Sequence, residues 1–266
     1  MDKRLMKSKQ KPASPNLEFE RKAGFPHFKV IGVDEVGRGC LAGPVVAAAV
    51  LLRPEWDLSL KKLINRHPEV EFITDSKAMT AKKRAELAPW IRENAAAFAI
   101  AHATVEEIDH LNIYHASHLA MKRAADALGE FHHVLVDGNV VPVHFRSENS
   151  PPSAASAIVK GDLRCLSIAC ASIIAKVFRD EWMRELAAEY PGYGLEVHKG
   201  YATAMHRLAL VTLGATAIHR RTFGPVREAL GLPPLAEERA AAAVAVTVAD
   251  EALERELNSP FLSEPL

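Results

Sequence analysis

The sequence has few cysteines, few aromatic residues and no long apolar run. Its 266 residues include three cysteines, Cys40, Cys165 and Cys170, and no C-x-x-C pair. This odd, sparse set excludes a small secreted scaffold held by disulfides and favours reduced intracellular thiols. Apolar runs such as 41–52 and 240–249 fall short of the roughly 20 residues of a membrane helix. The start lacks the apolar core of a signal peptide. We therefore expect a cytoplasmic protein that does not contact membranes.

The chain also lacks net charge, since 33 basic residues balance 33 acidic ones. A total of zero argues against a protein that coats nucleic acid by bulk charge. The charges are nevertheless sorted: residues 1–30 hold eight basic and three acidic residues, whereas 233–266 hold two basic and seven acidic. We expect a flexible basic arm over 1–27, one folded domain over 28–230 and an acidic, alanine-rich tail over 231–266.

The pattern of apolar residues within that domain predicts an α/β fold. Two apolar runs joined by a short turn-like stretch at 34–39 predict adjacent antiparallel strands, so the sheet should be mixed. Residues 53–72 are charged and are expected to form a loop. The other expected strands lie near 97–104, 133–138 and 157–159, and the expected helices near 80–92, 113–128, 167–188, 202–213 and 225–230.

Acidic residues follow several of the predicted strands. Asp34 and Glu35 come immediately after the first strand, Asp137 ends a buried strand, and Asp162 ends the next short one. Loops at such strand ends converge on one crevice in α/β proteins. Four carboxylates there would repel one another without a cation, and oxygen ligands favour Mg²⁺ or Mn²⁺ over zinc. A pair of such ions suits phosphoryl transfer, although a single aspartate at a strand end is more often a turn former.

The glycines of this first turn resemble a Walker phosphate loop only in their spacing. Arg38 and Gly39 stand where that loop requires lysine and serine or threonine. Asp34 and Glu35 inside the loop would also oppose a nucleotide phosphate. We reject a Walker loop, while the glycines still permit the backbone to approach a ligand closely.

Eight ordered blocks of the sequence resemble the type 2 ribonucleases H (ribonuclease HII). Together they span about 200 residues and share the order of that family. The blocks are VIGVDEVGRGCLAGPVVAAAV at 30–50, TDSK at 74–77, LNIYHASHLAMKRA at 111–124, VDGN at 136–139, VKGD at 159–162, ASIIAKVFRDEWM at 171–183, YPGYGLEVHKGYAT at 190–203 and HRRTFGPV at 219–226.

The resemblance implies a ribonuclease H-like mixed five-stranded sheet flanked by helices, with a small C-terminal helical region. By position, Asp34, Glu35, Asp137 and Asp162 match the family's metal-binding carboxylates. The backbone of Gly37, Arg38 and Gly39 matches the loop that meets the ribose 2′-OH, the group that distinguishes RNA from DNA. Tyr201 matches the tyrosine that packs on the nucleotide after the ribonucleotide. Asp180 lies in another matched block and is a rival for the fourth acid.

The implied activity is endonucleolytic cleavage, dependent on Mn²⁺ or Mg²⁺. The substrates would be RNA–DNA hybrids and duplex DNA with embedded ribonucleotides, cut to 3′-hydroxyl and 5′-phosphate ends by a monomer. A hybrid-binding protein without activity and a nuclease of the same fold with another substrate are the alternatives. Lys77, Lys176 and Lys199 are expected to contact phosphates; the other candidates for this groove are Lys160, Arg179, Arg220 and Arg221. Taken singly, each of these is more often a solvated surface charge.

Overall fold

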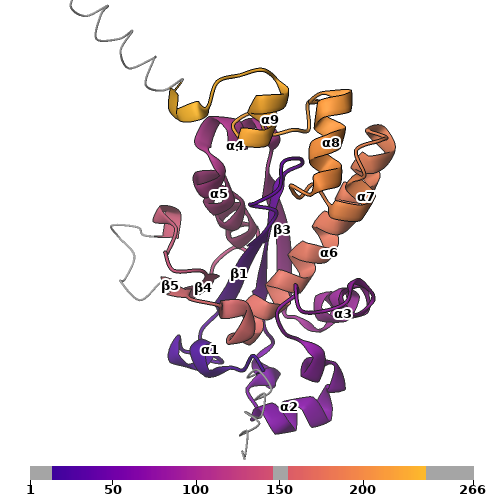
Figure 1. Cartoon of the computed structure of the whole chain (residues 1–266). Coiled ribbons are helices and arrows are strands. Elements are labelled where there is room, and N and C mark those ends of the chain that lie inside the picture. The colour runs from indigo at the N-terminus through magenta and orange to yellow at the C-terminus, as the bar shows by residue number, and fades with distance from the viewer. Residues whose placement is uncertain (1–13, 146–154, 238–266) are drawn as a thin grey trace, which may run out of the picture.

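A mixed five-stranded sheet forms the centre of the protein, which is represented here by a computed structural model describing residues 14–145 and 155–237 (Figure 1). The strand order is β3-β2-β1-β4-β5. β1 pairs antiparallel with β2, as does β2 with β3, whereas β1–β4 and β4–β5 are parallel. The mixed sheet expected from the sequence is therefore confirmed. The strands are β1 Val30–Val36, β2 Val45–Leu51, β3 Ala97–Ala103, β4 His133–Asp137 and β5 Ala155–Ile158.

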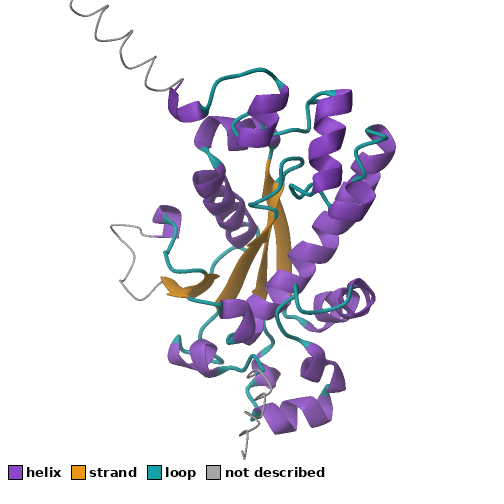
Figure 2. Cartoon of the chain, in the orientation of Figure 1, coloured by secondary structure: helices purple, strands orange, loops and turns teal. Residues whose placement is uncertain are grey.

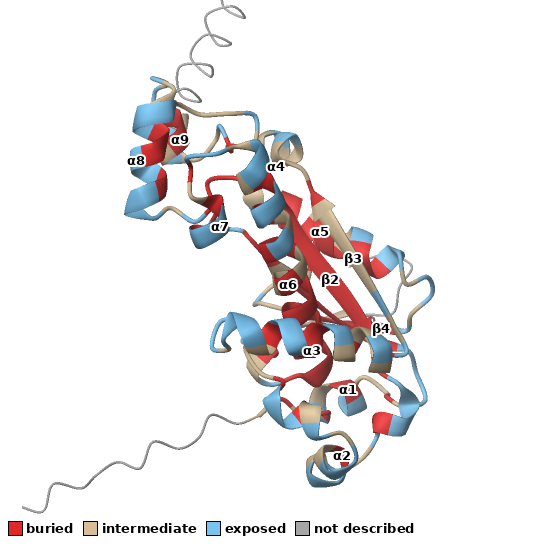
Figure 3. Ribbon diagram, turned by 90° about the vertical axis from the view of Figure 1, so that its right-hand side faces the viewer, coloured by how far each residue is buried: buried red, intermediate tan, exposed pale blue. Residues whose placement is uncertain are grey.

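Helices cover both faces of this sheet (Figure 2). Along β2, Val46, Ala48 and Val50 belong to the core cluster that contains α6 residues, whereas Val45, Ala47 and Ala49 belong to the cluster that contains α5 residues. Neighbouring side chains of a strand point to opposite faces. The uninterrupted apolar run of β2 follows from this burial on both sides, which Figure 3 shows as a red central strand.

The helices agree with the predicted periodicity in most places. α7, α8 and α9 gather beyond one end of the sheet and form the expected C-terminal helical region (Figure 1). Their shared core includes Leu41, Met183 and Tyr193. The helices are α1 Glu18–Lys22, α2 Leu60–Arg66, α3 Ala81–Asn94, α4 Val105–Leu111, α5 Ile113–Asp126, α6 Leu166–Glu189, α7 Leu195–His198, α8 Ala204–Leu213 and α9 Gly224–Ala229, with 3-10 turns at Pro54–Trp56, Pro68–Phe72, Val143–Phe145 and Gly161–Leu163.

Side-chain caps begin several of these helices. The Thr80 hydroxyl accepts the amide of Lys83 and starts α3 at the predicted position. Thr104 and Glu107 form a reciprocal capping box that starts α4, a helix that the sequence pattern did not predict. Asn112, with φ of 69°, then separates α4 from α5 and caps the latter. Such caps satisfy the free amides of a first helical turn.

The expected loop at 53–72 is largely helical. It contains α2 and two 3-10 turns. Trp56, Leu63 and Val70 are buried in the main core. The prediction was wrong because the many charged residues of this segment obscured three apolar residues seven positions apart, which anchor it to the body.

The folded body begins before residue 28. Helix α1 lies within the expected arm, and its Glu20 side chain is fully buried. The Glu20 carboxylate accepts hydrogen bonds from the Ser167 amide at 2.7 Å and the Cys165 thiol at 3.1 Å, so it ties α1 to the start of α6. Part of the arm is thus core, and only residues 1–13 of the expected arm lie outside the described residues.

The body also continues slightly beyond residue 230. The amide of Leu232 donates to the Arg227 carbonyl at 2.9 Å, and Arg227 Nε donates to the Pro233 carbonyl at 2.7 Å. The rest of the expected tail, 238–266, lies outside the described residues. Within 14–145 and 155–237, no helix combines the length and apolar character needed to cross a bilayer.

Candidate active site

Two of the predicted acids lie inside strand β1. Asp34 and Glu35 were expected directly after the strand, but β1 stays paired with β2 as far as Val36 and Val46. Alternation along the strand turns the two carboxylates toward opposite faces of the sheet. Asp34 shares the face of Gly32, where α6 packs. Its side chain is buried because α6 covers it.

Gly32 allows α6 to pack directly on β1. A Cβ atom at this position would lie only 2.4 Å from the Ser167 carbonyl carbon. From Gly32 to Asp34 along β1 and from Ser167 to Ser172 along α6, the chain advances by a similar distance of about 7 Å. Asp34 therefore meets Ser172, whose hydroxyl hydrogen-bonds to its carboxylate and to the Ser76 hydroxyl at 2.9 Å.

The Asp34 carboxyl has a strongly perturbed acidity. Burial raises its pKa well above the ordinary value, and the charges of Glu35 and Asp137 raise it further. The Ser172 hydroxyl and the Glu35 amide, which donates at 2.7 Å, offset part of this effect. The pKa of Glu35 is also raised, mainly by burial, although Arg38 at 3.1 Å favours its charged form. Such shifts concentrate at functional sites.

The other two predicted acids are joined by the backbone of Gly161. Asp137, the last residue of β4, accepts the Gly161 amide at 2.7 Å. A Cβ at Gly161 would lie 2.6 Å from Ile168 Cδ1 and 3.2 Å from the Asp137 carboxylate, so a larger residue would require these side chains to shift. Asp162 is the next residue along the chain. Burial, followed by the charges of Asp137 and Asp75, raises the pKa of Asp162 to about 6.

The loop that contains Lys77 supplies an acid that the sequence reasoning missed. Asp75 accepts the Lys77 amide at 2.8 Å and hydrogen-bonds to Asp162. Burial opposes the charge of Lys77, but Asp34, Asp162 and Asp75 outweigh this and raise the pKa of the lysine. Lys77, which was expected to contact a phosphate, therefore lies close enough to these acids to interact with their charges. Asp75 lies in the matched TDSK block, which was the available signal.

The oxygen ligands of these acids suit a hard divalent cation, but the distances between their carboxylates do not form a metal site. All four are oxygen donors, and burial and mutual repulsion raise the pKa of Asp34, Glu35 and Asp162. A cation would relieve that repulsion. Yet in the described part of the chain, no three Asp, Glu, His or Cys side chains are close enough to form a metal cage. The charges of Glu35 and Asp137 act on Asp34, and the charge of Asp137 also acts on Asp162, so these acids share one electrostatic field.

Two buried arginines support the glycine loop at 37–39. Gly37 has φ of 94°, and a Cβ there would lie 2.2 Å from Arg179 Nε. Arg179 donates to the carbonyls of Pro44, Ala42 and Lys199, and Arg220 donates to those of Gly43 and Arg38. Both arginines are fully buried. The sequence made them candidates for phosphate contacts, but they are buried and hydrogen-bond to the backbone that shapes the loop.

Tyr201 lies beside the same loop. It forms an isolated β-bridge with Cys40, the residue after Gly39, and its side chain is 37% exposed. Lys176 Nζ lies 5.7 Å from the centre of the Tyr201 ring. Lys199 turns its ammonium toward the Glu196 carbonyl of its own helical turn. The partly exposed ring of Tyr201, with the ammonium of Lys176 nearby, therefore lies beside the glycine loop.

The rival acid Asp180 is held in an ion pair. Its carboxylate lies 2.6 Å from Lys176 Nζ and 3.5 Å from Arg84 Nη2. All three side chains are largely buried. These cations neutralise Asp180, so the arrangement favours Asp162 as the fourth acid of the cluster.

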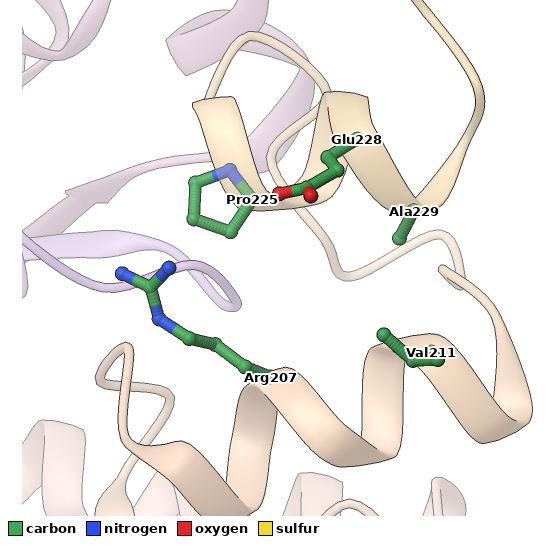
Figure 4. A pocket seen from close by; sticks show the side chains of 5 residues that line it. All are labelled: Arg207, Val211, Pro225, Glu228 and Ala229. Atoms are coloured by element: carbon green, nitrogen blue, oxygen red, sulfur yellow. The ribbon is translucent and has the colours of Figure 1, made fainter.

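A separate hollow lies between α8 and α9. It has a volume of about 470 Å³ and is lined by Arg207, Val211, Pro225, Glu228 and Ala229. Figure 4 shows the two α8 residues facing the three α9 residues across it. None of the predicted site residues lines this hollow, and it contains one acid. The carboxylate cluster at β1 and β4 is therefore the better candidate for catalysis.

Comparisons with known proteins show the family of the chain. The family model described as ribonuclease HII matches residues 31–226. A ribonuclease HII of Myxococcus xanthus is 49% identical over 78% of this chain and 65% of its own length. The ribonuclease HII of Ruegeria sp. is 48% identical over 81% of this chain and 87% of its own length.

Solved structures share the fold. The ribonuclease H2 of Pyrococcus horikoshii has a TM-score of 0.58 and 26% identity over 76% of this chain and 96% of its own. Bst-RNase HIII in complex with Mn²⁺ also has a TM-score of 0.58, with 21% identity over 77% of this chain and 70% of its own. The family model covers all the predicted site residues, from Asp34 to Tyr201. The chain therefore belongs to the ribonuclease HII family of hydrolases.

Proposed function

We propose that the protein cleaves the RNA strand of RNA–DNA hybrids and cuts duplex DNA on the 5′ side of an embedded ribonucleotide. The products would carry 3′-hydroxyl and 5′-phosphate ends. The observation that carries this proposal is the group of electrostatically interacting carboxylates Asp34, Asp137 and Asp162 within a chain of the ribonuclease HII family. We further propose that the protein acts as a monomer in the cytoplasm.

Asp34, Glu35, Asp137 and Asp162 would hold two divalent ions, Mn²⁺ or Mg²⁺. Mn²⁺ is the ion named for the similar Bst-RNase HIII. When bound, such ions activate water and neutralise charge at a phosphodiester. The protein orients two of these acids by hydrogen bonds, from the Ser172 hydroxyl to Asp34 and from the Gly161 amide to Asp137.

Recognition of RNA would fall to the loop at Gly37, Arg38 and Gly39. Space is open within 4 Å of a Cβ position at Gly39, so a ribose could approach this backbone closely. Arg220 holds the Arg38 carbonyl at 2.9 Å and so fixes the loop before substrate arrives. A rigid loop that reads a 2′-OH distinguishes RNA from DNA at one nucleotide.

Tyr201 would pack on the nucleotide that follows the ribonucleotide, and Lys77, Lys176 and Lys199 would attract nearby phosphates. Among these lysines, Lys77 has Asp34, Asp162 and Asp75 nearby, and their negative charges raise its pKa and keep it protonated. Lys176 and Lys199 are already engaged by Asp180 and the Glu196 carbonyl. We expect them to act through their field more than through direct contact.

The test compares three labelled duplexes in Mg²⁺ and in Mn²⁺: an RNA–DNA hybrid, DNA with one ribonucleotide, and plain DNA. We expect cleavage of the first two and loss of that cleavage in Asp34→Asn. Equal cutting of plain DNA would contradict the role of the glycine loop. Binding of the hybrid without cleavage in either ion would indicate a non-catalytic binding protein.

A further inference from the structure

Three buried histidines lie directly behind Tyr201. They are His198 at the end of α7, His206 in α8 and His219 in the turn before α9, and they are 8%, 0% and 1% exposed. The His198 and His206 rings stack with their centres 4.5 Å apart. The Nε2 atoms of His206 and His219 lie 3.1 Å apart. The proposed chemistry uses none of these imidazoles.

The surrounding donors and acceptors determine the tautomer of each ring. His219 Nδ1 has two partners, the Thr216 hydroxyl at 2.8 Å, which can donate or accept, and the Thr216 backbone amide at 3.0 Å, which can only donate. Nδ1 of His219 must therefore accept, and its proton resides on Nε2. That proton faces His206 Nε2, which must then accept, so His206 carries its own proton on Nδ1. The His206 Nδ1–H in turn donates to the Tyr201 carbonyl at 3.0 Å.

His198 completes the arrangement from the other side. The Gly200 amide donates to its Nδ1 at 3.2 Å, and its Nε2–H donates to the Tyr193 carbonyl at 2.7 Å. The His198 carbonyl accepts the Tyr201 amide at 3.0 Å. The Tyr201 amide is thus held by the His198 backbone carbonyl, and the Tyr201 carbonyl accepts both from the His206 ring and from the Thr203 amide, the latter at 2.8 Å.

We propose that His206, kept in its Nδ1–H tautomer by His219, is a positioning residue that orients Tyr201 toward the nucleotide beside the cleaved bond. This inference rests on the proposed function and deepens it. Three hydrogen bonds, which we call the relay, connect the Thr216 amide to His219, His219 to His206, and His206 to the Tyr201 carbonyl. Each ring nitrogen of His206 and His219 has a partner in it. Protonation of either ring would set two donors against each other. Burial lowers the pKa of both His206 and His219, which agrees with neutral rings.

Packing alone would require only the volume of the ring. A leucine at 206 could fill much of that volume but could not donate to Tyr201. An asparagine can place an amide N–H where His206 has Nδ1, while a glutamine reaches only the Nε2 position and restores the contact with His219. The two substitutions therefore distinguish the contribution of the Nδ1 contact with Tyr201 from that of the Nε2 contact with His219.

The experiment measures the ratio of cleavage rates on DNA with one ribonucleotide and on a uniform hybrid. We expect His206→Leu and His206→Gln to lower this ratio about fivefold to tenfold, the equivalent of one hydrogen bond. We expect His206→Asn to recover to within about twofold of the starting protein. His115→Asn, on the exposed start of α5, is the matched control and should leave the ratio unchanged. Equal ratios for the Asn, Gln and Leu variants would overturn the proposal.

A double-mutant cycle with Tyr201→Ala adds a readout that simple packing would not move. If His206 acts through Tyr201, His206→Leu should change the ratio little once Tyr201 is alanine. Additive effects would contradict the proposal. Melting curves of each variant identify those that fail to fold.

The unmodified protein gives a test that does not depend on any variant folding. Long-range ¹⁵N–¹H spectra of labelled histidines distinguish Nδ1–H from Nε2–H. We expect Nδ1–H for His206 and Nε2–H for His219; the opposite pattern at either ring would refute the relay. If the protein cleaves neither substrate, the proposed function fails, whereas the tautomers still decide whether the relay exists.

Discussion

Asp180 accepts a hydrogen bond from Lys176 Nζ at 2.6 Å, one turn earlier on the same helix. Its second oxygen faces Arg84, whose guanidinium donates to the carbonyls of Ser76 and Met79 in the loop of Lys77. Lys176 also lies below the Tyr201 ring. One buried carboxylate therefore connects two loops proposed to contact the nucleic acid.

Asp180→Asn should destabilise the protein strongly. It leaves the buried charges of Arg84 and Lys176 without their partner, and breaking such a pair costs about 3 kcal/mol. Urea unfolding measures this loss. Glu181→Gln, an exposed neighbour on α6, is the control and should have little effect. Unchanged stability together with weakened Mn²⁺ binding would make Asp180 the fourth metal acid in place of Asp162.

Asp34→Asn should have opposite effects on activity and stability. Loss of a metal-binding carboxylate removes several kcal/mol of transition-state stabilisation, so cleavage should fall about 10³-fold or more. The raised pKa of Asp34 means that its charge is unfavourable in the fold at neutral pH. In chelator at pH 7, the variant should therefore unfold at a higher urea concentration than the unsubstituted protein. Asp126→Asn, at an exposed position of α5, should change neither quantity.

Much of the candidate site followed from the sequence because three of its acids, Asp34, Glu35 and Asp137, sit in strongly apolar strands, whereas Asp162 lies in a 3-10 turn beyond β5. The pattern around Asp137 predicted a buried strand ending in an acid, and β4 ends at that residue. The position of Asp34 was less accurate, since a polar pair inside a strand looks like the start of a turn. Pairing with β2 extends β1 past both acids.

The supporting residues could not be predicted in the same way. Arg179 and Arg220 carry full charge, so a lone sequence places them at the surface. Only the folded chain shows the backbone carbonyls that surround their guanidinium groups. Glu20 was assigned to a flexible arm for the same reason. Burial of a charge depends on partners that are distant in sequence.

Gly37→Ala and Gly39→Ala should differ, although the two glycines belong to one loop. At Gly37 the left-handed backbone and the contact with Arg179 should cost about 1–3 kcal/mol of stability. Gly39 has open space around it, so alanine there should leave the melting temperature nearly unchanged. If a ribose approaches this backbone, Gly39→Ala should still weaken hybrid cleavage. Full activity of a stable Gly39→Ala protein would exclude that approach.

Asp162 should make the metal-free protein less stable as the pH rises from about 4 to about 6. Its folded pKa of about 6 lies above the ordinary 3.8, so the folded state binds more protons in this window. The favourable contribution is complete below the ordinary pKa and disappears as the pH passes the folded one. We expect the free energy of unfolding to fall by about 1–3 kcal/mol over this window. Asp162→Asn should remove this decline in urea titrations performed with chelator.

His219 should act in the opposite direction over nearly the same range. Its folded pKa of about 4 lies below the ordinary 6.5, so the unfolded chain binds the additional proton between these values. Stability from the neutral ring is complete above pH 6.5 and is lost as the pH falls toward 4, by about 2 kcal/mol. His219→Gln keeps an N–H near the Nε2 position but does not titrate. Its urea midpoint should therefore fall less on acidification than that of the unsubstituted protein, whereas parallel pH profiles would place the acid sensitivity at another group.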